Sequence, residues 1–304
     1  WARIEARTEA RERGSAGDLV RFGFAPLDTM SHGGMILGGT YVLAGREGTG
    51  KTTAACQIAA GVAARGEGVL YVALEGSTAM ISDTLMSYRS GVELTRITRD
   101  TLTADDVMAL TSASNDIAAW PLHIVSGAHC PTTVAGIEAA ARDLATPPRL
   151  IVVDHLLRMD GSRAGAKEHE RVEEIMPALV KMGERLGATV LLLAHIGRGE
   201  LRGGLYARPV AGMLAGGRTI EREAYGVLIL HREDKHPTSR ENVGSALVRG
   251  VVEVFAPKLR GVGDCLYERL RFRGEVQRFE PFALPGRDAG EDFPDAPPSY
   301  GDAE

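Results

Sequence analysis

The chain has 304 residues, of which 44% are hydrophobic and 25% charged, and its net charge is −5. These values are ordinary for a soluble globular protein, and the length allows one large domain or two small ones. No apolar run is long enough to span a bilayer and no signal peptide is visible, so we expect a cytoplasmic protein with no membrane partner. The three cysteines, Cys56, Cys130 and Cys265, lie far apart without CxxC spacing, which favours a reducing compartment over a disulfide framework or a zinc site.

The two ends of the chain differ in composition from its body. Residues 1–14 interleave charged and apolar side chains, which predicts that residues 1–18 form a linker helix and its connection. Residues 285–304 hold six acids and one Arg (net −5), so residues 1–284 are neutral. This Pro/Gly-rich acidic tail is expected to be disordered. We therefore predict one folded domain, 19–284, in a chain that begins with Trp1 rather than Met and fits a piece of a longer protein.

Apolar runs alternate with helical patterns along this domain. The alternation predicts an α/β fold, with a mostly parallel twisted sheet and helices on its two faces. Residues 196–217 are rich in Gly and Arg and predict a mobile loop, and the polar residues 232–247 predict a surface excursion. We expect strands at 40–44, 69–74, 122–125, 150–153, 189–194, 226–230 and 251–255, and helices at 52–64, 78–89, 103–117, 132–145 and 168–186.

A complete GxxxxGK[ST] pattern lies between the expected strand 40–44 and the expected helix 52–64. In this context the loop backbone can surround phosphate oxygens at a positive helix end, the lysine can reach the β- and γ-phosphates, and the hydroxyl can hold Mg²⁺. We therefore predict binding of ATP or another nucleoside triphosphate with Mg²⁺. The binding residues are Gly45, Arg46, Glu47, Gly48, Thr49, Gly50, Lys51, Thr52 and Thr53.

Three further strands end in a polar residue suited to phosphate chemistry. Asp154 ends an apolar run in the manner of a Walker B acid and would hold Mg²⁺ together with Thr52. Glu75 is the candidate for polarising the attacking water, and His195 is a candidate γ-phosphate contact. Taken singly, each residue could also have a purely structural role, as a turn-capping Asp, a solvated Glu or a hydrogen-bonding His. Together they predict one catalytic edge, because parallel strands bring their carboxyl ends to the same side of a sheet.

Lys258 and Arg260 follow the expected strand 251–255 and alternate, so an extended segment points them in one direction. They come too late in the chain to be evident ligands of the same subunit's phosphates. We predict that they act on a neighbouring subunit's site as arginine-finger cations. The alternative is a solvated basic hairpin.

These motifs, in this order, resemble the ATPase domain of the DnaB-like replicative helicases. Phe22-Gly-Phe-Ala-Pro-Leu-Asp-Thr-Met30 resembles the family's entry segment, and the resemblance extends over residues 19–284. It implies a RecA-like P-loop NTPase fold with a C-terminal antiparallel extension, and a hexameric ring that moves along single-stranded DNA in replication. By position it makes Lys51 and Thr52 the phosphate and Mg²⁺ residues, Glu75 the catalytic base, Asp154 the Walker B acid and Arg260 the finger, with Lys258 beside it.

His195 stands where bacterial members usually carry Gln, and this resembles the phage and mitochondrial primase–helicase branch. Membership of that branch would imply a protein of a bacterial or phage-infected cell, with a primase or helical domain upstream of Trp1. It would also imply that the acidic tail docks a polymerase or other replisome protein. DNA contacts are expected from cations in two loops. They are Arg158, Arg163 and Lys167 after the Walker B strand, and Arg198, Arg202 and Arg208 after His195.

Two other readings remain open. The same core fold serves ATPases of the RecA, RadA or KaiC kind, which act as recombinase filaments or regulatory switches. A loader that binds ATP as an assembly signal is a third class, which Glu75 argues against because such a signal requires no hydrolysis. A small-molecule kinase is disfavoured, since the sequence shows no arginine-rich lid.

Overall fold

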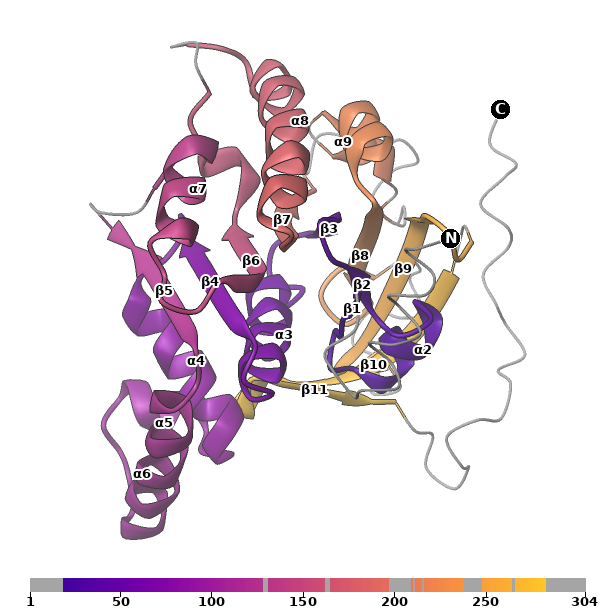
Figure 1. Ribbon diagram of the computed structural model, residues 1–304. Coiled ribbons are helices and arrows are strands. Elements are labelled where there is room, and N and C mark those ends of the chain that lie inside the picture. The colour runs from indigo at the N-terminus through magenta and orange to yellow at the C-terminus, as the bar shows by residue number, and fades with distance from the viewer. Residues whose placement is uncertain are drawn as a thin grey trace.

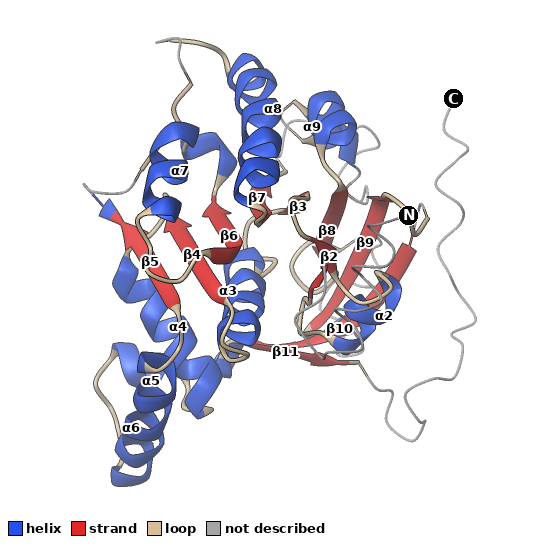
Figure 2. Ribbon diagram, viewed as in Figure 1, coloured by secondary structure: helices blue, strands red, loops and turns tan. Residues whose placement is uncertain are grey.

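The computed structural model describes residues 19–127, 131–161, 165–196, 209, 211–214, 216–237, 248–263 and 266–282. A central sheet lies between two layers of helices, and helices α5 and α6 project from one end of the body (Figures 1 and 2). No helix in these ranges combines the length and the apolar character that crossing a bilayer requires. The predicted linker (1–18) and the whole of the predicted acidic tail (285–304) lie outside the described residues, so the domain boundaries stay predictions.

The strands are β1 (Leu19–Val20), β2 (Met35–Ile36), β3 (Thr40–Gly45), β4 (Gly68–Ala73), β5 (Leu122–Ser126), β6 (Pro148–Asp154), β7 (Thr189–His195), β8 (Gly226–Arg232), β9 (Val251–Leu259), β10 (Leu266–Arg273) and β11 (Arg278–Pro281). The α-helices are α2 (Ala25–Met30), α3 (Lys51–Ala63), α4 (Thr78–Ser90), α5 (Leu94–Thr98), α6 (Ala104–Ala118), α7 (Val134–Arg142), α8 (Glu168–Leu186) and α9 (Gly217–Glu223). Short 3₁₀ turns are η2 (Leu156–Arg158), η4 (Ala211–Met213) and η6 (Gly274–Val276).

Within the described residues the main sheet has nine strands in the order β11-β10-β9-β8-β3-β7-β6-β4-β5. The strands from β8 to β5 are parallel, and β9, β10 and β11 continue the sheet in antiparallel pairing. The prediction of a mostly parallel sheet with a C-terminal antiparallel extension is confirmed. Strand β3 lies between β7 and β8, so the loop after it begins in the middle of the sheet.

The parallel strands are buried on both faces, which is why they read as nearly unbroken apolar runs in the sequence. In β6, Leu150 and Val152 pack into one core with α3 and α4, while Ile151 and Val153 pack into the opposite core with α7 and α8. The alternation holds the strand ends in fixed register between two helical layers.

All seven predicted strands are present with small changes of boundary, and the predicted helix 132–145 is shorter, at α7. One prediction of position is wrong: β9 continues to Leu259, so Lys258 lies inside the strand and does not follow it. A second is wrong in part, because Arg232 and Glu233 are buried and do not begin a surface excursion. The sequence analysis gave no residue ranges for seven elements: β1, β2, α2, α5, α9, and the strands β10 and β11 of the antiparallel extension.

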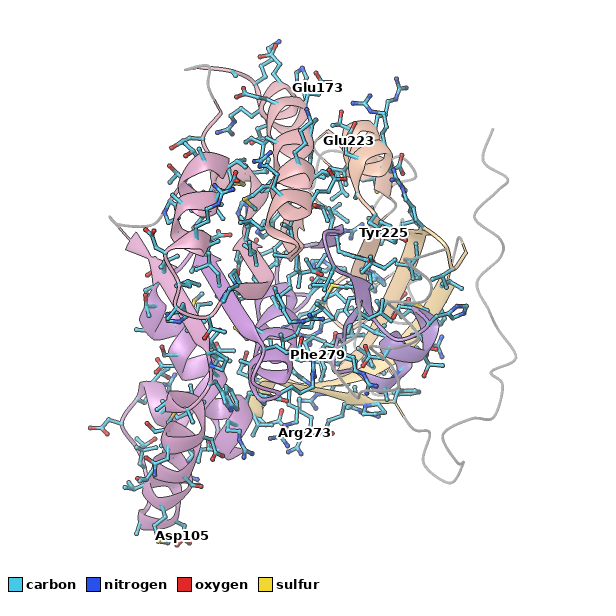
Figure 3. All side chains as sticks on the ribbon, viewed as in Figure 1. Asp105, Glu173, Glu223, Tyr225, Arg273 and Phe279 are labelled. Carbon is cyan, nitrogen blue, oxygen red and sulfur yellow. The ribbon has the colours of Figure 1, made fainter. Side chains whose placement is uncertain are left out.

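Strand β11 closes the sheet against α3 through Phe279, which is 2% exposed. The Phe279 ring packs edge-on against Phe24 with ring centroids 6.0 Å apart, and 4.7 Å from Phe272. Its main chain exchanges two hydrogen bonds with the Gln57 side chain, at 2.8 and 2.9 Å. Figure 3 shows Phe279 in the interior of the molecule, in contrast to Asp105 at the tip of α6.

We expect Phe279→Ala to lower the free energy of unfolding by ~3–5 kcal/mol, because it removes a buried ring that joins β11 to α3 and α2. Urea titration followed by circular dichroism measures the change. Val107→Ala on the exposed face of α6 is the control and should cost under ~1 kcal/mol. Equal losses in the two variants would show that β11 does not support the core.

Candidate nucleotide-binding and hydrolysis site

Four parallel strands bring their carboxyl ends together around the glycine-rich loop. Gly45, the last residue of β3, pairs with His195 of β7, and Ala73 at the end of β4 pairs with Asp154 of β6. Glu75 lies two residues beyond β4. The predicted meeting of Glu75, Asp154 and His195 at one edge is therefore present in the structure.

The loop turns sharply from β3 into α3, and glycine provides the required backbone conformations. Gly48 and Gly50 have φ values of 75° and 93°, which L side chains rarely adopt. A Cβ atom on Gly50 would also lie 2.8 Å from the Phe279 ring. The N-terminus of α3 then carries unpaired backbone N–H groups and the positive end of the helix dipole, which suit a phosphate.

Lys51 is the first residue of α3, and its side chain is buried. Its ammonium group donates to the carbonyl oxygens of Gly45, at 3.0 Å, and Arg46, at 2.9 Å. Burial lowers the pKa of Lys51 to about 8, although Asp154, Glu75 and Glu47 oppose the shift. Phosphate oxygens would favour the charged ammonium, so Lys51 is placed to exchange two neutral acceptors for anionic ones.

Thr52 and Asp154 connect the two phosphate-site motifs directly. The Thr52 hydroxyl donates to Asp154 Oδ2 at 2.9 Å, and the Tyr71 hydroxyl donates to the same oxygen at 3.1 Å. Burial raises the pKa of the Asp154 carboxyl, and these two hydrogen bonds oppose the rise. A hydroxyl and a carboxylate at the head of a phosphate loop are the hard oxygen ligands that Mg²⁺ prefers, so Thr52 and Asp154 fit the ion.

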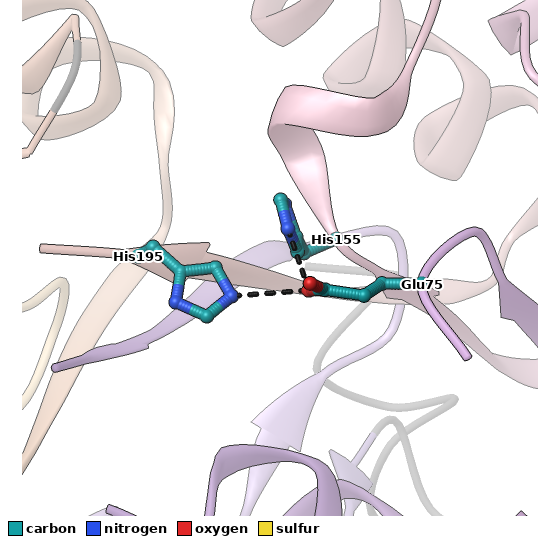
Figure 4. Close-up of side chains that lie close together, drawn as sticks. All are labelled: Glu75, His155 and His195. Atoms are coloured by element: carbon teal, nitrogen blue, oxygen red, sulfur yellow. Dashed lines mark hydrogen bonds and ion pairs between the residues drawn. The ribbon is translucent and has the colours of Figure 1, made fainter. Parts of the chain in front are cut away.

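Two imidazoles hold the Glu75 carboxylate. His155 Nε2 lies 2.7 Å from Glu75 Oε2, and His195 Nε2 lies 3.2 Å from the same atom (Figure 4). The two rings meet edge to face with centroids 4.4 Å apart. Burial alone would raise the pKa of Glu75, but His155 and then His195 outweigh it, and the net pKa is lowered. Glu75 is thus kept ionised, as a proton acceptor must be.

His155 contacts Glu75, and the sequence analysis did not select it. Burial lowers its pKa to about 4, with His195 adding to the shift and Glu75 opposing it. Its Nδ1 accepts a hydrogen bond from the Leu157 N–H at 3.2 Å, so the ring proton is on Nε2, which faces Glu75. The one available signal was its position directly after the Walker B aspartate.

The last residue of β8, a residue shortly after β8 and the residue just before β11 contact the phosphate loop and the start of α3, and none of them was predicted. Arg232 donates to the Gly48 carbonyl at 3.3 Å and is itself held by Asp234, at 2.7 and 3.0 Å. His236 Nε2 lies 2.8 Å from the Glu47 carbonyl oxygen. The Thr53 hydroxyl donates to Gln277 at 2.7 Å, so its side chain faces β11.

Lys258 and Arg260 lie at the opposite edge of the sheet from the phosphate loop. Leu259 of β9 pairs with Gly226 at the start of β8, whereas Gly45 pairs with Leu230 further along β8. Lys258 donates to the carbonyl oxygens of Glu221 and Arg222 at the end of α9, and Arg260 donates to the latter at 2.6 Å. The two side chains do point in one direction, toward the end of α9 and away from the phosphate loop of the same chain.

The structure describes two of the six residues predicted to contact DNA. Arg158 is exposed in η2, and Lys167 is exposed at the start of α8. The other four lie outside the described residues: Arg163, Arg198, Arg202 and Arg208.

Solved structures share this fold. One solved ATPase domain covers 93% of this chain and 99% of its own, with a TM-score of 0.77 and 21% identity. A DnaB-like replicative helicase, solved in a study of its interactions with primase, has a TM-score of 0.77 and 22% identity, covering 91% of this chain and 67% of its own. The RadB recombinase is more distant, with a TM-score of 0.56 and 16% identity over 87% of this chain and 100% of its own.

Two curated relatives resemble the chain in sequence. The DNA repair protein RadA of Brucella abortus is 25% identical over 80% of this chain and 45% of its own length. A probable plasmid replicative DNA helicase of Chlamydia muridarum is 24% identical over 80% of this chain and 54% of its own. The chain thus spans about half the length of these relatives. The family model for the DnaB-like helicase C-terminal domain matches residues 20–281, and the chain belongs to this family.

Proposed function

We propose that this chain is the NTP-hydrolysing motor of a DNA helicase, assembled as a ring, most simply a hexamer, that moves along single-stranded DNA. The observation that carries the proposal is the continuous set of contacts from Thr52 through Asp154 to Glu75. The Asp154 carboxylate accepts from Thr52, and its carbonyl oxygen accepts from the Glu75 N–H at 2.9 Å. Phosphate binding, ion binding and water activation therefore share one rigid unit.

Each residue of this unit has a part in hydrolysis. Lys51 and the N–H groups at the start of α3 hold the phosphates, and Glu75 takes a proton from the attacking water. His195 is placed beside Gly45, where it can contact the γ-phosphate. Mg²⁺, held by Thr52 and Asp154, would neutralise the charge that develops on the phosphate oxygens.

The position of Lys258 and Arg260 supports a ring, because β9 brings no cation to the γ-phosphate of the same subunit. Lys258 and Arg260 lie at the far edge of the sheet, where they would meet a second copy of the chain. Arg158 and Lys167, together with Arg163, Arg198, Arg202 and Arg208, would contact the DNA backbone without regard to sequence. The acidic tail 285–304 is proposed to dock a polymerase or other replisome protein.

A second candidate is a RadA-like DNA-repair ATPase, which the Brucella relative favours. The two functions differ in unwinding: a replicative helicase displaces a strand from a forked duplex at the expense of ATP, and a filament-forming recombinase exchanges strands. A forked duplex with a fluorescent strand distinguishes the two functions, because only the helicase releases that strand when ATP is added.

Single-stranded DNA should raise the ATPase rate several-fold. A motor couples hydrolysis to a bound strand, and the proposed contacts are to phosphates, so the stimulation should weaken with added salt. The measurement is steady-state phosphate release with oligo(dT) and, as control, a blunt duplex of equal length. A rate indifferent to single strands would favour the regulatory switch.

Glu75→Gln should leave nucleotide binding intact and lower kcat by ~10²–10⁴-fold, because the amide no longer accepts the proton of the attacking water. Binding is measured with a fluorescent ATP analogue, and turnover by phosphate release. The exposed Glu93→Gln at the start of α5 is the matched control and should turn over normally. Undiminished turnover in the first variant would remove Glu75 from the mechanism.

Arg260→Ala should lower kcat by ~10³–10⁵-fold if Arg260 stabilises the transition state of a neighbouring subunit. Mixing this variant with Lys51→Ala should restore activity, since the first provides an intact phosphate loop and the second an intact finger. The exposed Arg99→Ala is the control for charge. Failure of the mixture to regain activity, with mixed oligomers verified, would exclude a finger acting between subunits.

A further inference from the structure

The side chain of Glu75 is not held in place by its own strand. It lies beyond the end of β4, and its side chain is 45% exposed, whereas the His155 side chain is 7% exposed. A proton acceptor in a half-open position gains precision only from neighbours that are themselves fixed. His155 is such a neighbour.

Main-chain contacts fix the orientation of the His155 ring. His155 caps η2, where its Nδ1 accepts the Leu157 N–H at 3.2 Å. A ring nitrogen that accepts a hydrogen bond carries no proton, so the neutral ring has its proton on Nε2. That proton is directed at Glu75 Oε2, 2.7 Å away.

The contacts on Glu75 fall on one oxygen. His155 and His195 both lie against Oε2, and among the described residues no hydrogen bond or ion pair is made to Oε1. Holding Oε2 leaves Oε1 to accept a proton from water. The Glu75 main chain is fixed from the same place, because its N–H donates to the Asp154 carbonyl oxygen at 2.9 Å.

We propose that His155 is a positioning residue for hydrolysis, which holds Glu75 by Oε2 so that Oε1 faces the attacking water. The inference rests on the proposed function, since it gives Glu75 its role there. His155 differs in kind from His195. It is buried and tied to the η2 main chain, whereas His195 is 31% exposed at the end of β7, beside Gly45.

Asn and Gln at position 155 separate the two hydrogen bonds of the imidazole. The Asn amide lies near the place of Nδ1 and can accept the Leu157 N–H, but it does not reach Glu75. The Gln amide reaches the place of Nε2 and can donate to Glu75. His155→Phe keeps a ring and removes the two hydrogen bonds.

We expect His155→Phe and His155→Asn to lower kcat roughly 10- to 100-fold, with KM and the affinity for a fluorescent ATP analogue unchanged, and His155→Gln to recover most of the rate. His123→Phe, at an exposed site on β5, is the control for the substitution. Thermal unfolding and nucleotide binding verify that each variant is folded.

A double-mutant cycle then tests whether His155 acts through Glu75. In a Glu75→Gln background, His155→Phe should cause no further loss of single-turnover rate, because the group that it positions is already disabled. Equal losses in the two backgrounds, a change confined to KM, or recovery by Asn and not Gln would overturn the proposal. Full activity of Glu75→Gln alone would instead refute the role of Glu75 in the proposed function.

Discussion

The site depends on Asp154, which receives four hydrogen bonds from two separate parts of the chain. Its carboxylate accepts from Thr52 at the start of α3 and from Tyr71 within β4. Its carbonyl oxygen accepts from the N–H groups of Leu74 and Glu75, at 2.7 and 2.9 Å. A buried carboxylate is costly unless it is hydrogen-bonded, and two of the donors here, Thr52 and Glu75, are residues that the proposed reaction uses.

Residues from the C-terminal part of the chain contact the phosphate loop from another side. Phe279 closes over Gly50, Gln277 accepts from Thr53, and Arg232 at the end of β8 donates to the Gly48 carbonyl. The phosphate loop is therefore fixed on the one side by the parallel strands and on the other by residues that lie more than 180 positions later in the chain.

The sequence predicts the elements and residues whose signals lie in a short local stretch of chain. Strands β3, β4, β6 and β7 are buried on both faces, so each reads as an apolar run that ends in Gly45 or in a polar residue at the catalytic edge. Strand β10 reads Leu-Tyr-Glu-Arg-Leu-Arg-Phe-Arg, a half-exposed pattern rich in charge, and was missed for that reason. His155 and Gln277 contact partners that lie far away in the sequence, Glu75 and Thr53. No spacing rule in a single sequence reveals such contacts.

The direction of β9 determines which groups the Lys258 and Arg260 side chains can contact. An antiparallel neighbour of β8 must end where β8 begins, and the phosphate loop lies toward the other end of β8. The two cations instead donate to the last carbonyl groups of α9, where the helix dipole is negative. In the proposed ring, phosphate oxygens of a nucleotide bound by the neighbouring copy would replace these neutral carbonyl acceptors with charged ones. The phosphate loop and the basic pair lie toward opposite ends of β8. In the proposed ring, a head-to-tail arrangement of copies would bring the loop of one copy to the basic pair of the next.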